Sequence, residues 1–149
     1  MPTRSSARKR APVAMKRTPA FRAGIATRTR VLGRDYVERS LAAADSLTAP
    51  FQQIATEFAW GTVWQRPGLT LRERCMATVS MCIALNRPEE LRIHIRGALN
   101  VGVTEQAIGE LILHGFLYCG GPASLDAYRI AREVFSEPRP RKARSARRG

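Results

Sequence analysis

The residues best suited to acid–base chemistry are the two histidines, the only ones in the chain. His94 follows Glu90 by four residues in a segment with helical punctuation, and side chains at this spacing share one helix face. A carboxylate beside an imidazole tunes the histidine for proton transfer near neutral pH. The same spacing is also typical of a salt bridge on a helix surface. A catalytic and a structural role therefore both stay open on spacing alone.

His114, the second histidine, lies in the segment 113–122, where its immediate neighbours are mostly apolar. These neighbours predict burial, and a buried imidazole needs a hydrogen-bond partner. One interpretation is a core histidine bonded to a backbone carbonyl. The other is that His114, with Tyr118 one helical turn later, forms a second wall of a substrate pocket.

Large rings and guanidinium groups are concentrated between residues 60 and 74: Trp60, Trp64, Arg66, Arg72 and Arg74. Arginine is well suited to binding carboxylates because its planar fork forms two parallel hydrogen bonds. This cluster therefore indicates a site for an anionic substrate. The alternative is that the tryptophans pack in the core and that the arginines lie on a solvated helix start.

The net charge of +13 is unevenly distributed. Residues 1–34 carry ten Lys/Arg and no acid, and residues 139–149 carry six more, whereas residues 35–138 carry nine basic and twelve acidic residues. Composition therefore predicts one domain over 30–138, flanked by disordered basic tails over 1–29 and 139–149. The tails are interpreted as solvated extensions. A tether to nucleic acid or, for the first tail, a transit peptide are the alternatives.

The three cysteines, Cys75, Cys82 and Cys119, form no CxxC pair. An odd number without such a pair favours a reducing compartment, here the cytoplasm, and argues against a disulfide framework or a zinc site. Cys75 and Cys82 are expected to be small core residues. No apolar run approaches the roughly twenty residues of a membrane span, so no membrane association is expected.

Apolar residues recur at helical intervals from residue 35 to residue 135, and no segment alternates with a period of two. Thr70 and Glu73 form a capping box, and Pro88 and Thr104 are typical of helix starts. Gly120-Gly121-Pro122 is expected to break the last helical stretch. The sequence predicts a single all-α domain of about six helices, over 35–44, 50–59, 70–85, 88–102, 104–119 and 122–135.

Several motifs occur in one register. Residues 60–69 read WGTVWQRPGL, residues 90–94 read ELRIH, and residues 118–123 read YCGGPA; upstream, residues 30–37 read RVLGRDYV. Over about residues 30–136 the chain resembles the 4-carboxymuconolactone decarboxylases. This family is similar in fold to alkylhydroperoxidase D, an all-α superfamily whose members assemble as trimers or hexamers, and the resemblance implies the same for this chain.

The resemblance implies cofactor-independent decarboxylation of 4-carboxymuconolactone to the β-ketoadipate enol-lactone and CO2, a step of protocatechuate catabolism. It implies no metal, catalytic roles for His94 and Glu90, and a small lactone carboxylate as substrate. Substrate-binding roles are implied for Trp64, Arg66, Arg72, Arg74, His114 and Tyr118. Which residue donates the proton stays open.

Two other functions compete with decarboxylation. In the peroxidase branch of the superfamily a CxxCxxxH motif ends at the position of His94, and its cysteines would fall on Arg87 and Glu90. Their absence argues against a thiol-based alkylhydroperoxidase-like antioxidant enzyme. A non-catalytic nucleic-acid-associated protein that uses the basic tails is the second alternative, and the acidic balance of 35–138 argues against it.

Overall fold

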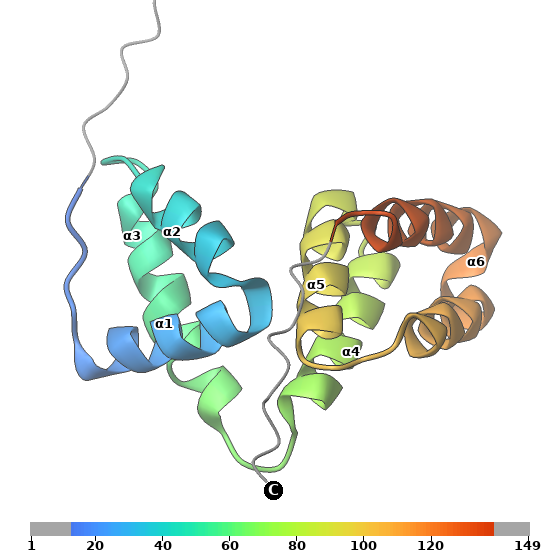
Figure 1. Ribbon diagram of the computed structural model, residues 1–149, viewed down its shortest axis with the longest axis horizontal. Coiled ribbons are helices and arrows are strands. Elements are labelled where there is room, and N and C mark those ends of the chain that lie inside the picture. Colours follow the sequence, from blue (N-terminus) through green and yellow to red (C-terminus); the bar gives the residue numbers. More distant parts are fainter. Residues whose placement is uncertain (1–12, 139–149) are drawn as a thin grey trace, which may run out of the picture.

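A computed structural model describes residues 13–138, and this part of the chain is all-α, as predicted. In Figure 1 the helices α1–α3 lie on the left, where a short segment, η1, continues α3, and α4–α6 lie on the right; a second short segment, η2, and a loop join the two groups at the bottom. The helices are α1 (Pro19–Leu32), α2 (Arg34–Ala42), α3 (Ala49–Ile54), α4 (Leu71–Ala84), α5 (Pro88–Asn100) and α6 (Glu105–Phe135); the short segments are the π-helical η1 (Ala55–Trp60) and the 3₁₀ turn η2 (Val63–Gln65).

Helix α1 corrects the prediction of a basic tail over residues 1–29. Thr18 caps the helix by accepting a hydrogen bond from the Phe21 amide, and Pro19 occupies the first turn. Phe21 and Val31 are buried, so this helix is part of the fold. Composition alone missed it because basic side chains cover its exposed face. Residues 1–12 and 139–149 lie outside the described residues.

Arg28 binds the three N-terminal helices together. Its guanidinium is buried and donates to Gln52 Oε1 at 2.9 Å, to Thr56 Oγ1 at 3.3 Å and to Ser40 Oγ at 3.0 Å. Burial lowers the pKa of Arg28, since none of these three partners carries a charge to offset desolvation. The contacts join α1, α2 and the α3–η1 segment through one side chain.

Helices α4, α5 and α6 begin and end at the predicted signals. The hydroxyl of Thr70 accepts from the Glu73 amide, and the Glu73 carboxylate accepts from the Thr70 amide, which completes the capping box of α4. Thr104 caps α6. Gly120, at φ 82°, bends α6, so the two last predicted helices form one bent helix.

The hydrophobic core extends over both groups of helices. Cys75 and Val79 of α4, Ile95 of α5 and Ile108 of α6 are fully buried in it, and Val31 of α1 joins the same cluster. The Asn100 amide donates to the Val31 carbonyl at 2.8 Å and ties α5 to α1. Within residues 13–138, no helix is long and apolar enough to cross a membrane.

Candidate active site

Glu90 and His94 lie on the first and second turns of α5, as their spacing predicts. Glu90 is exposed, whereas His94 is only partly exposed. Burial lowers the pKa of His94, and the nearby Glu90 carboxylate partly opposes that shift. The His94 imidazole is therefore neutral at pH 7.

The Nδ1 atom of His94 is the unusual feature of this site. It is buried, and no hydrogen-bond partner lies within reach in the described part of the chain. Buried polar atoms in native proteins nearly always have a partner, so an unpartnered one is a candidate for binding a ligand or moving a proton. A neutral imidazole is able both to accept and to donate a proton through its two ring nitrogens.

Cys82 of α4 lies near enough to Glu90 for the carboxylate to act on its thiol, a proximity that the sequence did not indicate. Burial raises the pKa of the Cys82 thiol, and the Glu90 carboxylate raises it further. The thiol is therefore protonated and uncharged at neutral pH, and it lies near the Glu90–His94 pair.

Arg74 lies on α4, the helix that packs against α5. Helices α4 and α5 are neighbours joined by a short turn and therefore run antiparallel (Figure 1). Arg74 lies eight residues before Cys82, about 12 Å along α4, and His94 lies four residues after Glu90, about 6 Å along α5. Arg74 and His94 thus both lie away from the turn that joins the two helices.

The hydrogen bonds of Arg74 are incomplete. Its Nη2 donates to the Arg66 carbonyl at 2.8 Å, which anchors the loop before α4, while its Nε is buried without a partner. Arg66 and Arg72 are exposed, and neither guanidinium forms a hydrogen bond or ion pair within residues 13–138. Of the three predicted arginines, only Arg74 combines partial burial with an unsatisfied donor.

The two tryptophans form a stacked pair at the junction of the two groups of helices. Their ring centroids lie 4.4 Å apart with an angle of 31° between the planes. Trp60 is buried in the core, and Trp64 packs against it from η2 while remaining partly exposed. Trp64 is therefore available to a ligand, whereas Trp60 is structural.

His114 and Tyr118 lie elsewhere. The prediction that His114 is buried is wrong: its apolar neighbours on α6 are themselves exposed, so they do not enclose it. His114 packs against Tyr118 with ring centroids 5.3 Å apart. Both line a groove of about 270 Å³ between α4 and α6, to which α5 contributes no residue. The groove therefore does not include the Glu90–His94 pair.

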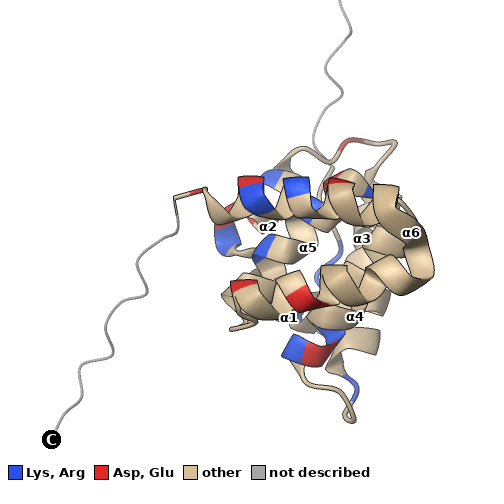
Figure 2. Cartoon of the chain, turned by 90° about the vertical axis from the view of Figure 1, so that its right-hand side faces the viewer, with Lys and Arg blue, Asp and Glu red and all other residues tan. Residues whose placement is uncertain are grey.

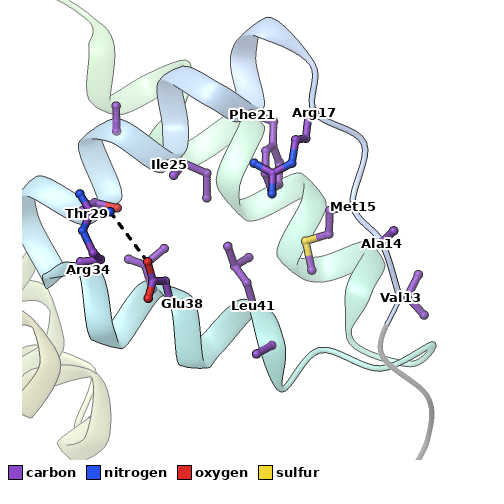
Figure 3. A pocket seen from close by; sticks show the side chains of 13 residues that line it. Val13, Ala14, Met15, Arg17, Phe21, Ile25, Thr29, Arg34, Glu38 and Leu41 are labelled. Carbon is purple, nitrogen blue, oxygen red and sulfur yellow. Dashed lines mark ion pairs between the residues drawn. The ribbon is translucent and has the colours of Figure 1, made fainter.

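A larger cavity of about 620 Å³ lies in the N-terminal group, between α1, α2 and the segment leading into α1 (Figure 3). Apolar side chains such as Phe21, Ile25 and Leu41 form its walls, with Arg17 and Arg34 at its edge. None of the predicted site residues lines it. It is therefore a separate feature of the N-terminal helices.

Comparison with known proteins decides the family. Residues 49–133 match the carboxymuconolactone decarboxylase family. The chain belongs to this family. Over 117 residues it is 44% identical to 4-carboxymuconolactone decarboxylase of Acinetobacter baylyi, an alignment covering 78% of this chain and 87% of that protein. It is also 44% identical, over 78% of its length and 82% of the relative, to nitrosuccinic acid decarboxylase of Metarhizium robertsii.

Both of these relatives are named as decarboxylases. They confirm the predicted enzyme class of this member of the carboxymuconolactone decarboxylase family, a carboxy-lyase. The thiols also differ from those of a peroxidase. Burial raises the pKa of Cys75 to about 11, whereas a reactive cysteine needs a lowered pKa. The cysteines are free, and none is positioned as a CxxC pair beside His94.

Replacing each cysteine by alanine tests the packing role. We expect Cys82→Ala and Cys119→Ala to keep most of the turnover, because both side chains are interpreted as packing groups. Cys75→Ala should lower the free energy of unfolding by about 1 kcal/mol, the cost of a small deletion in a packed core. Urea denaturation and steady-state kinetics measure the two quantities. Loss of turnover in a folded variant, with peroxide consumption by the parent, would contradict the packing role.

Proposed function

We propose that this protein decarboxylates 4-carboxymuconolactone to the enol-lactone of β-ketoadipate. The observation that carries the proposal is the buried, unpartnered Nδ1 of a neutral His94 beside Glu90. Membership of the carboxymuconolactone decarboxylase family and the 44% identity to a named 4-carboxymuconolactone decarboxylase support the same reaction.

The substrate supplies its own electron sink. The carboxylate that leaves is bonded to a ring carbon that a C=C bond connects to the lactone carbonyl. When the C–CO2 bond breaks, its electron pair moves through the C=C bond onto the carbonyl oxygen as an extended enolate. A proton then adds to the carbon next to the carbonyl, and the double bond ends at the carbon that lost CO2. The protein must hold the substrate, stabilise the enolate and deliver one proton.

His94 is the group that we propose delivers the proton. In the free enzyme it is neutral, but a doubly negative substrate beside it raises its pKa, so that binding draws a proton onto the ring. The resulting imidazolium stabilises the enolate and gives its proton to carbon. Glu90 favours the charged form of His94, in agreement with the direction of its effect on the pKa.

Arg74 is proposed to bind the carboxylate that the substrate retains. Arg74→Ala should raise KM by roughly tenfold to a hundredfold and change kcat less, since a hydrogen bond to a charged group contributes about 1.5–3 kcal/mol. Arg72→Ala, which removes an equally charged but exposed neighbour, is the matched control and should change KM by less than about threefold. Steady-state kinetics of both variants test the assignment, and equal effects would reject it.

The direct test is turnover by purified protein. Incubation with 4-carboxymuconolactone should release CO2 and form the enol-lactone, with or without a chelator. Nitrosuccinic acid is the informative second substrate, because its nitro group accepts the electron pair left by CO2 as a nitronate. Turnover of nitrosuccinic acid alone would keep the reaction type and replace the substrate, whereas no turnover of either would reject the proposal.

Two finer assignments accompany this proposal. The unpaired cysteines support a place in the cytoplasm. Family resemblance supports a homo-oligomer, of which the trimer and the hexamer are the expected forms. Neither assignment enters the chemistry proposed for His94.

A further inference from the structure

The cavity of about 620 Å³ between α1 and α2, here called the N-terminal cavity, is walled by one face of each helix. Phe21, Ile25 and Thr29 follow one another at four-residue intervals on α1, and Val37 and Leu41 do so on α2, so each set shares one helix face. Phe21 and Val37 are buried, whereas the other three are partly exposed. The volume lies within the roughly 300–1,000 Å³ of a typical ligand pocket, and the interior is mostly apolar.

The segment that leads into α1, residues 13–17, closes the cavity on a third side and is here called the strap (Figure 3). Gln53 of α3 holds it through both backbone groups of one residue. The Lys16 amide donates to Gln53 Oε1 at 2.9 Å, and Gln53 Nε2 donates to the Lys16 carbonyl at 2.9 Å. Because these hydrogen bonds already fix the strap, the cavity is preformed and a ligand has little ordering of the chain to offset.

The charges around the N-terminal cavity leave one cation without an anion. Among the residues that line it, only Arg17, Arg34 and Glu38 are charged, which gives a net charge of +1. Arg34 and Glu38 form an ion pair at 4.0 Å (Figure 3). The Arg17 guanidinium, at the edge, forms no hydrogen bond or ion pair within residues 13–138. A ligand that complements this cavity has an apolar body and one negative charge.

The groove between α4 and α6 lacks such a charge. None of the residues that line it is Lys, Arg, Asp or Glu, and Figure 2 shows the bend of α6 without blue or red colouring. Its volume of about 270 Å³ is also below the range of typical ligand pockets. The N-terminal cavity is therefore the better match for an anion with an apolar body.

We propose that the N-terminal cavity binds a monocarboxylate with an extended apolar chain. Phe21 and Thr29 lie eight residues apart on α1, about 12 Å along the helix, so the cavity suits a chain rather than a single ring. The chain lies between α1 and α2, and Arg17 binds the carboxylate at the edge. The substrate proposed for decarboxylation is a compact dianion, so the two sites select different molecules.

Isothermal titration calorimetry of the full chain with decanoate tests this site. We expect saturable binding of one decanoate per chain, and binding of octanoate, which is two methylene groups shorter, should be weaker by roughly tenfold or more. Ala42→Trp places a ring in the lining and should remove most of the binding. Ala43→Trp, at the next exposed position but outside the lining, is the matched control and should bind like the parent. Absence of saturable binding, or parent-like binding by a folded Ala42→Trp variant, would overturn the proposal.

The carboxylate contact is tested separately, with decanol as the uncharged analogue. Arg17→Ala should weaken decanoate binding by roughly fivefold, the upper end for an exposed ion pair, and leave decanol binding unchanged. Arg30→Ala, which removes an exposed arginine of α1 outside the lining, is the control. Equal losses in the two arginine variants, or equal losses of decanoate and decanol binding in Arg17→Ala, would reject the carboxylate contact. Since the readout is heat of binding rather than turnover, failure here leaves the proposed decarboxylation untouched.

Discussion

Replacing His94 with glutamine should lower kcat for decarboxylation by on the order of a hundredfold or more, which is the usual contribution of a positioned acid–base group. Glutamine has a similar size and keeps a polar group at the position of the unpartnered Nδ1, but it cannot carry a proton. Fold and substrate binding should therefore remain. Steady-state kinetics, with circular dichroism and the midpoint of urea unfolding measured on the same sample, check this expectation.

The dependence on pH separates a catalytic His94 from a structural one. Because burial places the pKa of folded His94 below its usual 6.5 and the imidazolium is the proposed proton donor, the parent's kcat/KM should rise as pH is lowered from about 6.5 through that pKa. In the same window the unfolded chain binds more protons than the folded chain, so the free energy of unfolding should rise with pH. Both dependences should weaken in His94→Gln. If kcat/KM of a folded His94→Gln protein stays near that of the parent, His94 is structural.

The C-terminal group of helices was predictable because its signals are local. A capping box at Thr70, a cap at Thr104 and a glycine at the bend of α6 act through atoms within a few residues, so spacing along the chain is sufficient to recognise them. The Glu90–His94 pair belongs to the same class, since four residues on a helix fix which side chains are neighbours.

The features that sequence reasoning missed depend on contacts between distant segments. Helix α1 has a usable local signal, Thr18 followed by Pro19 with Phe21 and Val31 on the buried side, but the arginines around it suggested a tail. The separation of His114 from His94 had no local signal, because apolar neighbours predict burial only where another element covers them. The proximity of Cys82 to Glu90 follows from the pairing of α4 with α5, which spacing does not specify.

Helix α1 and the π-helical segment η1 cross so closely that one added carbon atom would disturb their contact. A Cβ added to Gly24 would lie 1.9 Å from the Thr56 carbonyl oxygen, and one added to Gly61 would lie 2.1 Å from the Ala20 carbonyl oxygen. The obstacles are backbone atoms, so no side-chain rotation relieves the clash and the helices must move apart. Gly24→Ala should therefore lower the free energy of unfolding by about 3 kcal/mol or more, at the upper end of overpacking effects.

Gly109→Ala is the matched control, because it adds the same methyl group within a helix where nothing lies within 4 Å. Removing glycine from a helix interior should raise the free energy of unfolding by about 0.5–1 kcal/mol. Urea denaturation should show that Gly24→Ala lowers the free energy of unfolding whereas Gly109→Ala raises it. A Gly24→Ala variant as stable as the parent would contradict the tight contact between α1 and η1. Gly24→Ala should also raise KM, because the crossing positions Trp60, the Trp64 ring stacked on it, and the loop whose Arg66 carbonyl holds Arg74.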